Sequence, residues 1–439
     1  MLPPWLAIAG LGYVIANAPP ARWTAAAARS IIAALAERRP GMPRPCFTTP
    51  KETFMSELDR ILSDAVAADH VPFVVGMTGN AAGVTWSGAA GRARADLLAA
   101  QDTVFRIFSM TKAVGSTAAM ILMDRGKLNP DTPVAEILPS FGNKQVLDGF
   151  NADGKPRMRA PRTQATVRHL ATHTSGLVYE FWNTDIPRYM QATGLPTILS
   201  GLREGLDYPL MFDPGTRWDY GIGIDWLGQV VEKVDGRSID RFCREEILQP
   251  LGMKDTRFEA EPDIAPRLAT VRMRGEDGRF ADFELAPPAK PAFYGMGHTL
   301  YSTAPDYLRF LRMFLNKGQL DGRRILSEAG LARLLANQIG DTPIPLLKTA
   351  APPVTADAEF FPGRKKTHSM AFQRIEEDVP GMRSAGSQFW AGVCNTHYWF
   401  DPAKDVAGVL MTQTLPFVEP RFMGVYEAFE RGVYRAMVR

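Results

Sequence analysis

One segment constrains the fold of this chain more than any other. Residues 109–125, SMTKAVGSTAAMILMDR, are apolar on nearly every helical face, and Gly126 follows them as a helix-terminating glycine. A helix without a polar face must be buried between layers of structure. The chain can supply those layers, because its 439 residues, 46% hydrophobic and 22% charged, have an ordinary globular composition with room for two packed lobes.

Segments on both sides of this helix predict an antiparallel sheet flanked by helices. Residues 51–68 have the spacing of apolar side chains that is typical of an amphipathic helix. Two β-rich runs, 71–77 and 83–88, flank a Gly79-Asn80 turn signal and predict a hairpin. Further helices are expected at 223–234, 237–248, 307–315, 327–336 and 420–437, and further strands at 387–393, 397–400 and 407–412. We expect the last helix to close the chain against the sheet, near the first one.

The expected fold class is therefore α+β, with a mainly helical insertion. Residues 51–140 and 288–439 would form a sheet domain that is discontinuous in sequence, residues 141–287 would form the helical domain, and the active site would lie between the two. Residues 1–50 are expected to be a leader or a poorly ordered extension. Their apolar run, 4–18, is short for a membrane span and is not preceded by Lys or Arg, which favours a cytoplasmic location over export.

The composition argues against several kinds of partner. The 50 basic and 47 acidic side chains are scattered, and the net charge of +3 leaves no basic stripe that would bind nucleic acid. The six histidines and three cysteines lack the spacing of metal-binding motifs, so we expect no metal, no other cofactor and no disulfide framework. Each cysteine is expected to be a small buried residue, and Cys394 lies near the proposed site.

Ser109 and Lys112 give the first chemical signal. Their spacing places a hydroxyl and an amine on one face of a helix, within reach of each other. A lysine can take the proton of a serine once burial has disfavoured its charged form, and an apolar helix supplies that burial. At the start of a helix, Ser109 also lies beside free N–H groups that favour an oxyanion, its own N–H among them.

The segment 105–128, FRIFSMTKAVGSTAAMILMDRGKL, resembles the active-site segment of class C β-lactamases, penicillin-binding DD-peptidases and family VIII carboxylesterases. Residues 168–177, RHLATHTSGL, resemble the His-Leu-Leu-Thr-His-Thr-Ser-Gly-Leu signature of the same superfamily. The family uses no metal, so the resemblance implies that His169 and His173 orient the backbone near the site through hydrogen bonds.

A third motif implies a catalytic tyrosine. Residues 212–220, FDPGTRWDY, are similar to the Phe-x-Pro-Gly-x-x-Trp-x-Tyr stretch of the family, whose final tyrosine is catalytic, and this maps the role onto Tyr220. Beside a cationic Lys112, the phenol pKa can be lowered enough for Tyr220 to accept the proton of Ser109 and later to donate it to the leaving alcohol. Both Lys112 and Tyr220 therefore stand as candidates for the general base.

The sequence departs from the β-lactamase pattern at two places. The asparagine that usually follows two residues after the catalytic tyrosine is replaced by Ile222, so a polar substrate-holding group is missing. The Lys-Thr-Gly motif has two candidates, Lys348-Thr349-Ala350 and Trp390-Ala391-Gly392. We choose the second because a strand and a Trp-Phe-Asp-Pro segment follow it, as in family VIII esterases, whereas Lys348 lies in a Pro-rich loop.

This choice implies an oxyanion hole and an apolar pocket. The N–H of Val393 would be the second oxyanion donor beside that of Ser109. Trp390 replaces a cation that β-lactamases present to the substrate carboxylate, and an apolar wall suits neutral esters better. An apolar acyl pocket would be lined by Tyr179, Phe181, Trp182, Phe389 and Trp390, together with Ala391, Gly392 and Ile222 as substrate contacts.

We therefore predict a serine carboxylesterase that cleaves small, short-acyl esters through an acyl-enzyme on Ser109. The absence of Gly-x-Ser-x-Gly excludes a nucleophile elbow of the α/β-hydrolase kind. The competing hypotheses of the same chemistry are β-lactamase, D-aminopeptidase or short-amide hydrolysis and acyl transfer to an alcohol. A catalytically silent relative that binds acylated ligands or partner proteins is the alternative of another class, which the intact Ser109, Lys112 and Tyr220 disfavour.

Overall fold

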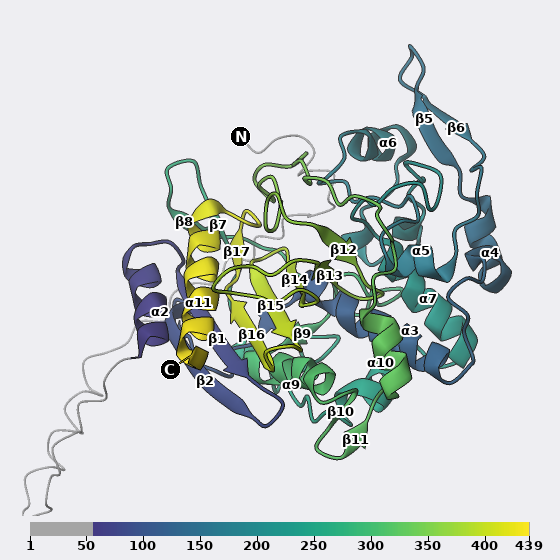
Figure 1. The fold of residues 1–439 in the computed structure, drawn as a ribbon. Helices are drawn as coiled ribbons and strands as arrows, with labels where there is room; N and C mark the ends of the chain where they lie inside the picture. The colour runs from purple at the N-terminus through teal and green to yellow at the C-terminus, as the bar shows by residue number, and fades with distance from the viewer. Residues whose placement is uncertain (1–55, 439) are drawn as a thin grey trace, which may run out of the picture. The chain divides into compact units, whose positions relative to one another are not determined.

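An eight-stranded antiparallel sheet organises residues 56–438, the part of the chain that the structure, a computed structural model, describes (Figure 1). Its strand order is β12-β13-β14-β15-β16-β1-β2-β3. The strands are β1 (Phe73–Gly79), β2 (Val84–Arg94), β3 (Leu97–Leu98), β12 (Lys366–His368), β13 (Gln373–Ile375), β14 (Gln388–Gly392), β15 (Thr396–Asp401) and β16 (Val406–Met411). Because β1 pairs with β16, the two ends of the described chain share one sheet, and the predicted fold class is confirmed.

Helices cover both faces of this sheet. They are α2 (Glu57–Ala67), α3 (Thr111–Asp124), α4 (Val134–Ile137), α5 (Val167–Ala171), α6 (Asp185–Thr193), α7 (Gly223–Asp235), α8 (Ile239–Cys243), α9 (Ala304–Leu315), α10 (Glu328–Leu335) and α11 (Pro420–Val438). On β15, Trp399 contacts Phe429 of α11, whereas the next residue, Phe400, stacks on Phe314 of α9. Successive strand residues point to opposite faces, so α11, with α2 beside it, lies on one face and α9 on the other (Figure 1).

Helix α3 lies in the interior, as its composition predicts. All of its residues from Thr111 to Met123 are buried, and it packs against α7 and α10. Gly115 lets α3 lie close to Met296, because a Cβ at residue 115 would be only 2.7 Å from the Cβ of Met296. Gly126, with a φ of +69°, follows the helix in the left-handed region that favours glycine.

Short strands outside the main sheet and single helical turns complete the described residues. Short strands are β4 (Phe105–Arg106) with β9 (Tyr301–Ser302), β5 (Val146–Phe150) with β6 (Pro156–Arg159), β10 (Gln319–Leu320) with β11 (Arg323–Arg324), and β7 (Arg272–Arg274) with β8 (Phe280–Asp282) and β17 (Thr414–Leu415). Single helical turns are η2 (Phe108–Met110), η3 (Pro139–Asn143), η4 (Ile198–Ser200), η5 (Arg203–Leu206) and η7 (Ala265–Arg267), and η6 (Arg244–Leu248) is a π-helical turn after α8. Since β7 pairs with β17, residues 272–282 associate with the C-terminal part of the chain. The division into a sheet domain and a helical domain stays a prediction.

Several predictions concern the N-terminal residues. The extension 1–50, its apolar run 4–18 and Cys46 lie outside the described residues. No helix among residues 56–438 combines the length and apolar character needed to cross a membrane. Cys243 and Cys394 are buried free thiols, and burial raises the pKa of both.

Candidate active site

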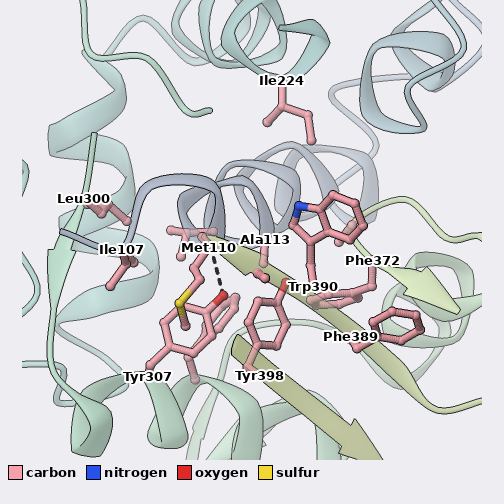
Figure 2. Close-up of a cluster of buried hydrophobic side chains, with 14 of the residues drawn as sticks. Ile107, Met110, Ala113, Ile224, Leu300, Tyr307, Phe372, Phe389, Trp390 and Tyr398 are labelled. Carbon is pink, nitrogen blue, oxygen red and sulfur yellow. Dashed lines mark hydrogen bonds between the residues drawn. The ribbon is translucent and has the colours of Figure 1, made fainter. Parts of the chain in front are cut away.

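Ser109 lies in the turn η2, between strand β4 and helix α3. The preceding residue, Phe108, has a φ of +41°, a conformation that is strained for a residue with a side chain. Tertiary hydrogen bonds hold the turn: the hydroxyl of Tyr307 donates to the Met110 carbonyl over 2.9 Å, as Figure 2 shows, and the Leu300 N–H donates to the Thr111 hydroxyl over 3.1 Å. Ser109 itself is half-buried, so part of its surface stays exposed.

Lys112 is buried one turn along α3, with only 2% of its surface exposed. Its Nζ lies 3.1 Å from Ser109 Oγ, 2.9 Å from the hydroxyl of Tyr179 and 2.8 Å from the carbonyl oxygen of Gly297. Burial lowers the pKa of Lys112 to about 7, against the opposing charge of Asp225. A large fraction of the amine is therefore uncharged at neutral pH, next to the serine hydroxyl.

Tyr220 lies against the same pair. Its ring is 4.9 Å from Lys112 Nζ, and the indole N–H of Trp390 donates to its hydroxyl oxygen over 2.9 Å. Burial raises the phenol pKa of Tyr220, while hydrogen bonding to Ser109 and Trp390 opposes the rise. The expected lowering of this pKa by Lys112 is wrong, because the burial that neutralises the amine also disfavours the phenolate.

Two histidines fix the backbone around Tyr220 and α5. The ring of His173 accepts the Gly221 N–H at Nδ1 over 3.4 Å, and its carbonyl accepts the Asp219 N–H over 2.9 Å. Burial, with the charges of His368 and Lys112, holds its pKa well below the usual range, so it stays neutral. His169 accepts the Thr166 N–H at Nδ1 and caps α5. Both rings bond to the backbone, as the resemblance implies.

The end of strand β14 approaches the turn that carries Ser109. A Cβ on Gly392 would lie 2.3 Å from the carbonyl oxygen of Ile107, so only glycine allows the strand this close. Val393 follows directly and is half-buried, whereas Ala391 is buried within the strand. The role of Val393 as an oxyanion donor stays a prediction.

Aromatic side chains form a closed series of contacts that includes Tyr179 and Tyr220, the two rings next to Lys112. Each ring contacts the next, with centroids between 4.7 and 6.5 Å apart. In order, the members are Tyr179, Phe181, Trp182, Phe417, Phe360, Trp390 and Tyr220. We call this set of seven residues the aromatic cluster. The Pro-rich stretch 351–363 contributes Phe360 to this set, and the N–H of Ala350, directly before that stretch, donates to the Phe181 carbonyl over 2.9 Å.

Two predicted pocket residues are buried beside the site, and two residues that contact it were not predicted. Phe389 packs against Phe360 as well as against Phe361 and the buried Arg383, and Ile222 is fully buried in the same hydrophobic core as Tyr220 and Trp390. Their role as substrate contacts stays a prediction. Lys348 is exposed in its loop. Phe360 and Phe417 belong to none of the motifs that predicted the site. Among the described residues, no cluster of His, Cys, Asp and Glu is arranged to hold a metal ion.

Comparisons with known proteins find a family model, relatives and solved structures that match most of this chain. The family model described as Beta-lactamase matches residues 58–431. Monacolin J acid methylbutanoyltransferase of Aspergillus terreus is 28% identical over 346 residues, which are 76% of this chain and 82% of that protein. Lovastatin esterase of Penicillium rubens is 28% identical over 350 residues, which are 76% and 86% of the two chains. The solved structure of unliganded simvastatin synthase from Aspergillus terreus has a TM-score of 0.73 and 26% identity, and the match covers 86% of this chain and 97% of that one.

Proposed function

Because this chain belongs to the beta-lactamase family, whose members include serine hydrolases and acyltransferases, we propose that it is a serine carboxylesterase for small neutral esters. The observation that carries the proposal is the 3.1 Å contact between Ser109 Oγ and the buried amine of Lys112, whose pKa is about 7. A neutral amine at this distance can take the serine proton at physiological pH.

Acylation then proceeds in balanced steps. Lys112 accepts the proton of Ser109 as Oγ bonds to the ester carbonyl carbon, and the oxyanion is held by the N–H groups of Ser109 and Val393. The bond to the alcohol oxygen breaks, and that oxygen takes the proton of Tyr220. Trp390 donates to the Tyr220 oxygen, which leaves the phenol's own proton free to serve as this acid. The ammonium of Lys112 then returns a proton to Tyr220. Water attacks the acyl-enzyme by the same sequence of steps, which releases the acid and restores Ser109.

The aromatic cluster supports a substrate with an apolar acyl group. Its members present faces and edges of rings but no charged group that would pair with a substrate carboxylate. Trp390, at the place of the family's Lys-Thr-Gly lysine, contributes an indole. These features favour neutral esters of short acyl chains over β-lactams or D-alanyl peptides.

Acyl transfer to an alcohol is the second candidate. The relative from Aspergillus terreus is named as a methylbutanoyltransferase, and the acyl-enzyme on Ser109 would be common to both reactions. An alcohol would replace water as the nucleophile in the second half. Product analysis after adding a primary or secondary alcohol to the ester reaction separates the two, because transfer yields a new ester and hydrolysis only the free acid.

The direct test is hydrolysis of p-nitrophenyl acetate and butyrate by the wild type, Ser109→Ala and Ser116→Ala. Ser116 is the matched control, since it is a buried serine on the same helix. We expect turnover to be lost only in Ser109→Ala, and intact mass spectrometry to find one acyl adduct in the wild type. Undiminished activity in Ser109→Ala would refute the proposal. Faster turnover of a cephalosporin or a D-alanyl peptide than of the esters would show that the substrate is a β-lactam or a peptide and not a neutral ester.

A further inference from the structure

A carboxylate is buried directly behind Lys112. Asp225 lies in the first turn of α7, and none of its side-chain surface is exposed. Its Oδ1 accepts the N–H of Gly297 over 2.9 Å, and the carbonyl of the same glycine accepts the Lys112 amine over 2.8 Å. A single residue of backbone thus connects the carboxylate to the proposed base.

The packing around Gly297 leaves no space for any other residue. A Cβ there would lie 2.5 Å from Asp225 Oδ2 and 2.8 Å from the hydroxyl of Tyr179, which also accepts from Lys112. A Cβ on Gly295 would lie 2.6 Å from Asp225 Oδ1. The segment 295–298 therefore wraps closely around the carboxylate.

This carboxylate is incompletely satisfied. Among the described residues, Asp225 Oδ2 and His298 Nδ1 are buried atoms without a hydrogen-bond partner, and Asp225 Oδ1 lies 3.4 Å from that His298 nitrogen. Burying a carboxylate with so few partners costs stability, and a neutral residue of similar size would avoid that cost. A contribution to stability therefore does not explain the buried charge.

We propose that Asp225 is a positioning residue for Lys112: it fixes the Gly297 carbonyl that holds the amine beside Ser109, and its negative charge opposes loss of the ammonium proton. The proposal rests on the proposed function, in which Lys112 is the base. Other titratable groups face this amine as well, namely Tyr179 and Tyr220 across their rings and His173, whose own pKa Lys112 lowers. Of these groups, Asp225 is the one that carries a negative charge, because burial raises the pKa of both phenols.

The test is the pH dependence of acylation in Asp225→Asn. Asparagine keeps an oxygen that can accept the Gly297 N–H but removes the charge, so the amine of Lys112 loses its proton more easily. The acidic limb of kcat/KM for p-nitrophenyl butyrate should move to lower pH by about one to two units, the order of effect that removing one nearby buried charge has on a pKa. The ratio of activity at pH 5.5 to that at pH 8 should rise by about tenfold.

Two further variants sharpen the result. Asp306→Asn removes another buried carboxylate, on α9, and should leave the limb unmoved. Asp225→Ala also lacks the acceptor for the Gly297 N–H, so it should show the same shift with an additional loss of rate, and it serves if the asparagine variant does not fold. An unmoved limb in a folded Asp225 variant overturns the proposal.

Labelling keeps this outcome separate from the proposed function. The rate at which a fluorophosphonate modifies the wild type is followed across the same pH range by intact mass. Labelling that is lost in Ser109→Ala and has a shifted limb in Asp225→Asn supports both proposals. Labelling with the wild-type limb in Asp225→Asn rejects only the role of Asp225, whereas labelling that persists in Ser109→Ala rejects the proposed function.

Discussion

Replacing Lys112 by methionine should stabilise the protein in a pH-dependent way while abolishing catalysis. Burial lowers the pKa of Lys112 from an ordinary value of 10.5 to about 7. Between these values the unfolded chain binds a proton that the folded chain releases, so the stability of the wild type rises with pH across this window. Methionine does not bind a proton, so the stability of Lys112→Met does not change with pH for this reason.

The size of the effect follows from the two pKa values. At pH 7 the wild type loses about 4 kcal/mol relative to a lysine with an unshifted pKa, and at pH 9.5 it loses only about 1.5 kcal/mol. The free-energy gap between wild type and Lys112→Met should therefore change by about 3 kcal/mol between these pH values. The lost hydrogen bonds to Tyr179 and Gly297 shift both measurements equally, so they cancel from the change.

The assay is urea unfolding of both proteins at pH 7 and pH 9.5, with Lys348→Met as the control. Lys348 is exposed, so its replacement should give a gap that does not depend on pH. A gap for Lys112→Met that stays constant between the two pH values would show that the amine is charged in the folded protein. That result would remove the main support for Lys112 as a base.

Three other perturbations test separate parts of the structure. Trp390→Phe removes the N–H that donates to Tyr220, so kcat for p-nitrophenyl butyrate should fall about tenfold with little change in KM, whereas Trp86→Phe, in β2, should leave kcat unchanged. Phe360→Ala opens the aromatic cluster, so the ratio of kcat/KM for p-nitrophenyl hexanoate to that for p-nitrophenyl acetate should rise about tenfold. An unchanged ratio would remove Phe360 from the pocket. Arg383→Met leaves Glu430 buried without its partner and should cost about 3–5 kcal/mol in urea unfolding, whereas Arg435→Met breaks an exposed pair and should cost less than about 1 kcal/mol.

The parts of the fold that the sequence predicted are those with a local signal. Helix α3 has an apolar surface all round, the hairpin β1–β2 has a turn signal, and Tyr220 ends the continuous motif 212–220. Each signal lies within one continuous segment, because helix burial and turn chemistry depend on neighbours in sequence.

The rest depends on contacts between distant segments. Phe360 and Phe417 reach the site from a loop and from the segment after β17, and nothing in either segment predicts which ring it meets. Trp390 was predicted as an apolar wall, yet its N–H also binds Tyr220, because the partner comes from 170 residues away. The pKa of Tyr220 was predicted in the wrong direction, since a motif shows that a lysine is near but not how deeply the pair is buried.

The contacts of Lys112 also indicate which hydroxyl group donates to the lone pair of its neutral amine. A neutral amine has two N–H donors and one lone pair, and the Gly297 carbonyl can only accept, so one donor is always used there. If Tyr179 donates to the lone pair, Ser109 can only accept and is not activated; if Tyr179 accepts, the lone pair is left for the proton of Ser109. Burial and the charge of Asp225 both raise the pKa of Tyr179, so this tyrosine keeps its proton. The same charge favours the orientation in which the O–H of Tyr179 points toward the carboxylate and away from the amine. Tyr179→Phe should therefore slow acylation less than Lys112→Met does, because phenylalanine also leaves the lone pair to Ser109.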